Sequence, residues 1–103
     1  MKYIMLVCNA GMSTSMLVTK MQKAAEEKGF ESTIWAVPVS EADAEVASKE
    51  IDVLLLGPQV KFLLKEFKSK FEPDIKVDAI NMVDYGMMNG ANVLESAISM
   101  MGE

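Results

Sequence analysis

The chain has 103 residues, half of them hydrophobic and about a quarter charged, which predicts one folded domain over residues 1–103 with a core of its own. Ten basic and 15 acidic residues give a net charge of −5 without any basic cluster, which argues against nucleic acid and anionic membrane surfaces as partners. A single cysteine excludes an intrachain disulfide, and the absence of histidine excludes Ser-His-Asp and Cys-His catalysis and most zinc sites.

The first strand and the first helix are visible in the hydrophobic pattern. Residues 3–7 form a continuous apolar run, which is typical of a central strand covered on both faces. Apolar side chains then recur at helical spacing at Leu17, Met21 and Ala24. Gly29 is well placed to end this helix, because glycine readily adopts the left-handed conformation that follows many helices.

A second strand and a short helix follow. Residues 33–37 are rich in β-branched and aromatic side chains, so they predict a strand, and Pro38 closes it. Ser40 is the expected N-cap of a helix that runs through Ala47, and acidic residues stand in its first turn, where they favour a helix.

The third strand precedes the most amphipathic segment of the chain. Residues 53–56 are solidly apolar, and Gly57 and Pro58 end the strand. Residues 60–71 predict one helix with lysines on its outer face. The apolar face of this predicted helix comprises Val60, Leu63, Leu64, Phe67 and Phe71.

The last strand and the last helix are separated by a segment without a period. Residues 75–80 predict the strand, and apolar spacing from Val93 to Met101 predicts the helix. Residues 81–89 predict a loop or a short turn of helix.

This alternation of strands and helices predicts an α/β fold, a three-layer doubly wound four-stranded parallel sheet with helices on both faces. We expect the strand order 2-1-3-4. In such sheets ligands bind beyond the carboxyl ends of the strands, where the strand order reverses. That point lies between the first and third strands, so residues 8–15 and 57–59 form the candidate site.

The loop after the first strand has a composition that suits an anion. Gly11 allows a positive φ, so successive backbone N–H groups can turn toward one centre, and the following helix adds its own free N–H groups. Three hydroxyl side chains offer further donors, and such a turn favours the reactive thiolate of a neighbouring cysteine. The candidate phosphoryl-binding residues are Cys8, Asn9, Ala10, Gly11, Met12, Ser13, Thr14 and Ser15.

Each feature has a simpler alternative. A lone cysteine at the end of a buried strand is most often an inert small hydrophobe, and a strand-to-helix loop of small residues often serves tight packing alone. The coincidence of both at the predicted switch point favours a functional site.

The loop lacks a cation. A cysteine-dependent phosphatase needs a C-x5-R loop, in which the arginine stabilises the transition state, and Thr14 holds the arginine position here. A phosphoryl group on Cys8 would therefore be held by neutral donors, which is the profile of a phosphoryl carrier. The alternatives are a low-molecular-weight phosphatase or arsenate reductase, and a non-catalytic module for a flavin nucleotide or another phosphate ligand.

The quoted residues resemble a family. The C-x-A-G-M-S-T-S loop from Cys8 to Ser15, the L-L-G-P-Q-V run over residues 55–60 and the D-Y-G triplet over residues 84–86 resemble the IIB component of the phosphoenolpyruvate-dependent sugar phosphotransferase system, in the lactose/cellobiose group. The form of the loop is closest to the cellobiose/chitobiose branch. The resemblance extends over nearly the whole chain.

The resemblance implies a phosphocysteine intermediate on Cys8. The donor would be a phosphohistidine on the IIA protein, and the acceptor a β-disaccharide bound to the membrane IIC permease, with no cofactor and no metal. Gln59 and Tyr85 are candidates for a supporting shell, and surface residues or packing are the alternatives for them. Met12, together with Met87 and Met88, would suit an adaptable docking surface.

The chain is expected to be cytoplasmic, where a lone thiol stays reduced. Its longest apolar run, residues 3–8, is far shorter than the roughly 18 residues that span a bilayer, and it is also too short for an export signal. We therefore expect no insertion into a membrane.

Overall fold

A computed structural model describes residues 1–9 and 12–102, and for residues 12 and 13 it describes the backbone alone. Strands and helices alternate as the hydrophobic pattern predicts. In chain order the elements are β1 (Lys2–Cys8), α1 (Met12–Lys28), β2 (Ser32–Pro38), α2 (Val39–Ser48), β3 (Val53–Leu56), the 3₁₀ helix η1 (Pro58–Leu63), α3 (Leu64–Phe71), β4 (Lys76–Ala79), α4 (Met82–Gly86) and α5 (Gly90–Met100).

The four strands form one parallel sheet in the order β2-β1-β3-β4, which confirms the predicted order. In this register Met5 of β1 lies between Trp35 of β2 and Leu54 of β3. The chain leaves β1 toward β2 on one side and later leaves β3 toward β4 on the other. The switch point therefore lies between β1 and β3, at the edge where all four strands have their carboxyl ends.

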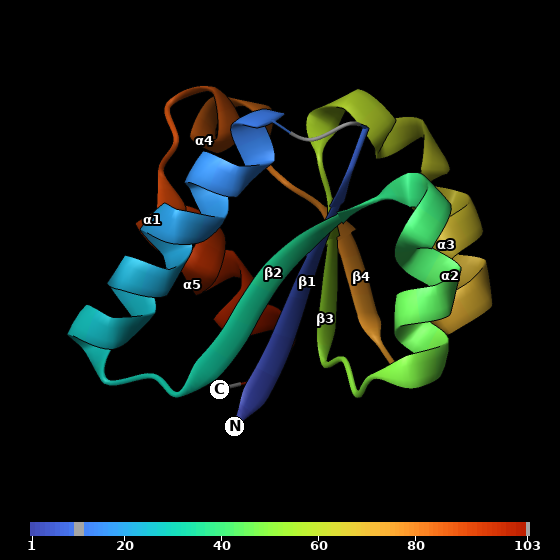
Figure 1. The fold of residues 1–103 in the computed structure, drawn as a ribbon, viewed down its shortest axis with the longest axis horizontal. Coiled ribbons are helices and arrows are strands. Elements are labelled where there is room, and N and C mark those ends of the chain that lie inside the picture. Colours follow the sequence, from blue (N-terminus) through green and yellow to red (C-terminus); the bar gives the residue numbers. More distant parts are fainter. Residues whose placement is uncertain (10–11, 103) are drawn as a thin grey trace.

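Helices cover both faces of the sheet, so the three-layer architecture is confirmed (Figure 1). The helices α1, α4 and α5 lie on one side, and α2, η1 and α3 lie on the other. Alternate residues of β1 feed two separate cores: Ile4 and Leu6 pack toward α1 and α5, whereas Met5 and Val7 pack toward α2 and α3. The continuous apolar run of β1 is therefore explained by burial on both faces.

Gly29 ends α1 as predicted. Its φ is +70°, and its N–H donates to the carbonyl of Glu26 at 3.2 Å, while the N–H of Phe30 donates to the carbonyl of Ala25 at 2.9 Å. These two bonds satisfy carbonyls that the end of a helix leaves free, which is the Schellman arrangement.

The predicted cap of α2 is wrong. The helix begins at Val39, directly after the last residue of β2, and Pro38 occupies the N-cap position without a side-chain bond. Ser40 therefore lies inside the first turn. Proline fits at this boundary because its fixed φ suits a helix start and it has no N–H to satisfy.

The prediction of one helix over residues 60–71 is also wrong. A 3₁₀ helix and an α-helix share this segment, and Val60 has non-helical angles (φ −119°, ψ 19°). The N–H of Val60 closes a turn onto the carbonyl of Gly57 at 3.0 Å, which buries the Val60 side chain beneath the turn. Packing of this residue against the sheet thus outweighs the continuity of the helix.

The unpatterned segment after β4 contains a short helix, the second of the two predicted outcomes. Asn81 caps α4, because its side-chain oxygen accepts from the N–H groups of Val83 and Asp84 at 2.9 and 3.1 Å. The helix α5 then packs closely on α1 at Gly90. A Cβ at Gly90 would lie 2.6 Å from the carbonyl carbon of Lys20, so only glycine fits this crossing.

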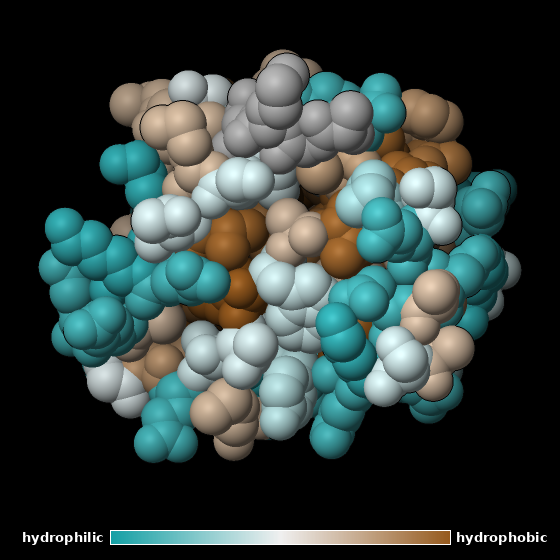
Figure 2. Space-filling view, viewed as in Figure 1, coloured by the Kyte–Doolittle hydropathy of each residue, from teal (hydrophilic) through white to brown (hydrophobic). Residues whose placement is uncertain are grey.

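The outer margins of the two helical layers are hydrophilic in the space-filling view, and hydrophobic residues show between the layers, beside the central strand (Figure 2). Over residues 1–9 and 12–102, no helix combines the length and the apolar character that crossing a membrane requires.

Candidate active site at the carboxyl end of the sheet

Cys8 is the last residue of β1 and lies at the switch point. It belongs to the face of the sheet that carries Ile4 and Leu6, the face that α1 and α5 cover. Its neighbour across the switch point is Gly57, which follows β3. The N–H of Gly57 donates to the carbonyl of Val7 at 2.8 Å, and a Cβ built on Gly57 would lie 3.6 Å from Cβ of Cys8. The two predicted halves of the site are therefore adjacent.

The thiol of Cys8 is buried, with 3% of the residue exposed. Its Sγ lies 3.9 Å from the carbonyl oxygen of Val37, to which the S–H can donate a weak hydrogen bond. This contact requires the protonated thiol. A reaction at Cys8 must therefore release this contact and open a path to the sulfur.

The other residues of the predicted loop lie in different surroundings. Asn9 and Ser15 are exposed, and Thr14 is completely buried in the first turn of α1. Ala10 and Gly11 lie outside the described residues, and so do the side chains of Met12 and Ser13. The convergence of backbone N–H groups on one centre stays a prediction.

Tyr85 brings the two halves of the site together. Its hydroxyl lies 3.2 Å from Oγ1 of Thr14 and accepts a hydrogen bond from Nε2 of Gln59 at 3.3 Å. The ring of Tyr85 also packs against the core between the sheet, α1 and α5. Gln59 and Tyr85, both considered from the sequence, are thus joined to Thr14 in one chain of hydrogen bonds. No local pattern could predict this chain, because its members are 26 and 71 residues apart.

The position that an arginine would hold in a phosphatase loop is occupied by this buried Thr14. Its hydroxyl is engaged with a neutral phenol. All ten basic residues of the chain are lysines, so no guanidinium can reach the site from elsewhere in the sequence. Among the residues that the structure describes, the hydrogen bonds around Cys8 therefore come from uncharged groups.

The family model for the lactose/cellobiose-specific IIB subunit of the phosphotransferase system (PTS) matches residues 3–96. The chain belongs to this family. It is 49% identical to the galactose-specific EIIB component of Lactococcus lactis subsp. cremoris and 48% identical to the cellobiose-specific EIIB component of Lactococcus lactis subsp. lactis; each comparison covers 97% of this chain and 96% of the relative. This membership makes the chain a sugar-specific phosphoryl carrier component.

The fold agrees with that of a solved IIB protein. The solution structure of a cellobiose-specific IIB component from Borrelia burgdorferi superimposes with a TM-score of 0.77 at 41% identity, and the comparison covers 98% of this chain and 92% of the other. PTS IIB components work with IIA and IIC components in the sugar phosphotransferase system.

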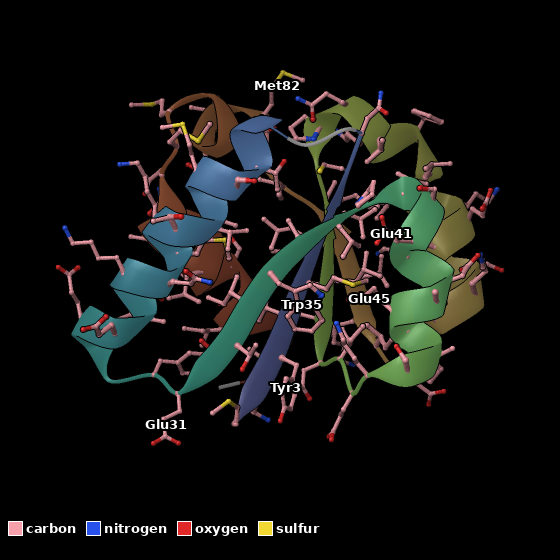
Figure 3. The ribbon with its side chains drawn as sticks, viewed as in Figure 1. Tyr3, Glu31, Trp35, Glu41, Glu45 and Met82 are labelled. Atoms are coloured by element: carbon pink, nitrogen blue, oxygen red, sulfur yellow. The ribbon has the colours of Figure 1, made fainter. Side chains whose placement is uncertain are left out.

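Exposed apolar side chains surround the carboxyl end of the sheet in this IIB chain. They stand on α1, η1 and α4 and just after α4, all of which leave the carboxyl ends of strands (Figure 1). Met82 lies at this end and Tyr3 at the opposite end (Figure 3). The exposed residues are Met16, Phe62, Met82, Val83 and Met87.

Of the methionines proposed for docking, Met87 is exposed, whereas Met88 is half-buried and packs against the core. The sequence reasoning missed Met16, Phe62, Met82 and Val83. A usable signal was present, because each is an apolar residue outside any apolar face of helical period.

An open groove of about 510 Å³ runs along β4, and its lining includes Asp78, Asn81 and Ser96 but not Cys8, Gln59 or Tyr85. Within residues 1–9 and 12–102, no cluster of three metal-ligating side chains occurs.

Proposed function

We propose that Cys8 carries the phosphoryl group that this IIB component transfers. The observation that carries the proposal is the place of the chain's only thiol: it ends the central strand at the switch point, four residues before α1 begins, in a chain of the IIB family. The donor is a phosphohistidine of the IIA protein, and the acceptor is a sugar bound to the membrane IIC component. The exchange takes place in the cytoplasm, where the thiol stays reduced.

The transfer consists of two displacements at phosphorus. In the first, the thiol of Cys8 gives up its proton and the thiolate attacks the phosphoryl group in line; an S–P bond forms, and the P–N bond breaks with its electron pair returning to the imidazole of the donor, which takes up the proton. In the second, a sugar hydroxyl attacks, the S–P bond breaks and the thiolate is regenerated, while the hydroxyl proton passes to a base on the acceptor side. Residues 9–15 supply N–H and hydroxyl donors to the phosphoryl oxygens.

The neutral character of the site supports a carrier over a phosphatase. A guanidinium at position 14 would stabilise the transition state for hydrolysis as well as for transfer. Thr14 cannot do so, and its hydroxyl is already engaged with Tyr85. A phosphocysteine in such a site persists until the acceptor arrives, which is what a carrier requires.

Because Cys8 is buried, its partner proteins must also make the thiol accessible. Since only 3% of Cys8 is exposed, the docked IIA or IIC protein must stabilise a conformation in which Sγ is accessible. The exposed apolar residues around this end of the sheet support docking there, because methionine side chains adapt to more than one partner surface. The isolated chain should accordingly react slowly with iodoacetamide.

The proposed sugar is a β-disaccharide of the cellobiose/chitobiose type. The form of the cysteine loop and the similarity to cellobiose-specific relatives support this assignment. The contacts that select the sugar belong to the IIC component. In a strain that lacks its cellobiose IIB component, this chain should restore uptake of cellobiose, and restored uptake of galactose alone would exclude the assignment.

The test of the phosphoryl carrier uses the whole chain. Incubation with phosphoenolpyruvate, the general transfer proteins and the IIA partner should add one phosphoryl group by intact mass, and peptide mapping should place it on Cys8. Cys8→Ser should remove this label, whereas the control Ser48→Ala, on the outer face of α2, should keep it. Turnover of an aryl phosphate would instead indicate a phosphatase, and coloured purified protein a flavin module.

A further inference from the structure

The hydroxyl of Tyr85 meets two side chains from distant parts of the chain. It lies 3.2 Å from Oγ1 of Thr14 and 3.3 Å from Nε2 of Gln59. Thr14 stands in the first turn of α1, Gln59 in η1, and Tyr85 in α4. These three elements leave the carboxyl ends of β1, β3 and β4, so one phenol ties together the three connections that surround Cys8.

The groups involved fix the direction of one of the two hydrogen bonds. Gln59 donates through Nε2, so the phenol oxygen of Tyr85 accepts. Between Tyr85 and Thr14 either hydroxyl can donate. In both cases the phenol oxygen holds two partners at once, and loss of the hydroxyl removes both hydrogen bonds.

One end of the chain lies beside Cys8, and the other lies in the helix turn that follows the cysteine loop. At one end, Oε1 of Gln59 lies 3.1 Å from the point where a Cβ on Gly57 would stand, and that point is 3.6 Å from Cβ of Cys8. At the other end, Thr14 belongs to the helix turn that follows the predicted phosphoryl-binding loop. The side chain of Thr14 is completely buried, so the hydroxyl of Tyr85 is its hydrogen-bond partner in place of water.

Tyr85 itself is held from two sides. Its ring packs against the core beneath α1 and α5, and α4 is fixed at its start by the side chain of Asn81, which accepts from two backbone N–H groups. The phenol oxygen thus has a defined place before any ligand binds, which is the condition for positioning other groups.

We propose that Tyr85 is a positioning residue for phosphoryl transfer. Its hydroxyl sets the place of the first turn of α1 relative to Gln59 and Cys8, and so aligns the N-terminal end of α1 with a phosphoryl group on Cys8. This inference rests on the proposed role of Cys8. Loss of the hydroxyl should slow the chemical step more than it weakens docking of the donor, since misplacement of reacting groups acts on the transition state.

The experiment measures single-turnover transfer from phosphorylated IIA over a range of donor concentrations, at a temperature at which urea titration shows every variant fully folded. Tyr85→Phe and Thr14→Val should each lower the rate constant at saturating donor about tenfold, and leave the half-saturating donor concentration within about twofold. The double variant should be no slower than the slower single variant, because both changes break one chain.

Two variants serve as controls. The chain has one other tyrosine, Tyr3, at the opposite end of the sheet, so Tyr3→Phe removes a hydroxyl far from the site and should transfer at the wild-type rate (Figure 3). Thr14→Ser keeps the buried hydroxyl and should remain within about twofold of wild type, whereas Thr14→Val keeps the shape of the side chain and loses the hydroxyl. If packing of Thr14 mattered and its hydrogen bond did not, Thr14→Ser would be the slower of the two.

Three outcomes would overturn the inference while the role of Cys8 stands. They are an unchanged rate constant in Tyr85→Phe, an equal loss in Tyr3→Phe, or a rise in half-saturating donor concentration with no loss of rate, which would assign Tyr85 to docking. If wild-type protein takes up no phosphoryl group, the proposed function itself fails, and the two failures are thus distinguishable.

Discussion

The two ends of the parallel sheet are held by different kinds of polar contact. At the carboxyl end, the hydrogen bonds around Cys8 join neutral groups, Thr14, Tyr85 and Gln59, and apolar side chains are exposed around them. Toward the amino end, where α2 finishes, the contacts are charged. There Glu45 accepts from the indole N–H of Trp35 at 2.9 Å and from Lys49 at 2.8 Å.

The charged cluster is arranged for stability. The ammonium of Lys49 also lies 5.5 Å from the centre of the Trp35 ring, so the three side chains of this cluster bind one another (Figure 3 shows Trp35 beside Glu45). At the carboxyl end, the described hydrogen bonds around Cys8 join uncharged groups instead. The difference teaches that charged contacts stabilise one end of the sheet, whereas neutral contacts hold together the connections around the proposed site at the other end.

The largest effect on stability should come from a position that belongs to neither end. In Gly90→Ala the new Cβ would lie 2.6 Å from the carbonyl carbon and 2.7 Å from Cβ of Lys20, at the crossing of α5 and α1. Backbone atoms cannot move aside there, so we expect a loss of roughly 2–3 kcal/mol in the free energy of unfolding. Urea denaturation measures this loss.

The control for this change is Gly86→Ala. No atom lies within 4 Å of a Cβ at Gly86, so its unfolding free energy should stay close to that of wild type. Gly90→Ala also calibrates the transfer assay, because it should retain phosphoryl uptake wherever it is folded. If folded Gly90→Ala failed to take up the phosphoryl group, the packing of α5 on α1 would be needed for transfer as well as for stability.

Gly57→Ala, at the carboxyl end of the sheet, should instead slow phosphoryl transfer and leave stability nearly unchanged. The backbone of Gly57 (φ −63°, ψ 155°) suits alanine, and the new methyl would press on Oε1 of Gln59 at 3.1 Å, the end of a flexible side chain. We expect stability to change by less than about 1 kcal/mol and the transfer rate to fall about tenfold, because Gln59 is displaced beside Cys8. Denaturation and single-turnover transfer test the two parts, and a normal rate would contradict the role of this turn.

A smaller effect is expected at the cap of α4. Asn81→Ala leaves the N–H groups of Val83 and Asp84 without their acceptor, and caps of this kind contribute about 1 kcal/mol. Hydrogen exchange should quicken at these two amides, and transfer should slow a few-fold because α4 carries Tyr85. The control is Ser99→Ala at an exposed position of α5, which should change neither; equal exchange in both variants would argue against the cap.

The smallest effect should come from the charged cluster. The hydrogen bond from Lys49 holds the pKa of Glu45 below its usual range against an opposing effect of burial, and the hydrogen bond from Trp35 and the charge of Lys49 lower this pKa to a smaller extent. Since the folded state favours the ionised carboxylate, its contribution is complete at neutral pH and is lost as the pH falls through the folded-state pKa. Glu45→Gln should therefore lower the melting temperature slightly at neutral pH, and the difference from wild type should shrink in acid and in high salt. Transfer should be unaffected.

Much of the fold could be predicted because the burial of a strand or helix is visible in the hydrophobic pattern of its own residues. The runs over residues 3–7 and 53–56 are apolar throughout, and both strands are covered on two faces. Gly29 could be placed because an L-residue resists a φ of +70°. The prediction of a single helix over residues 60–71 was wrong because the turn at Val60 depends on packing against the sheet, which the local sequence does not reveal.

The sequence by itself determined the order of strands and helices, the uncharged composition of the loop after Cys8 and membership of the IIB family, because each depends on residues that are close in the chain. Only the tertiary structure decided that Cys8 is buried and that Tyr85 joins Thr14 to Gln59. A hydrogen bond between side chains 71 residues apart follows from how the layers pack, and hydrophobic periodicity contains no information about which polar tips then meet.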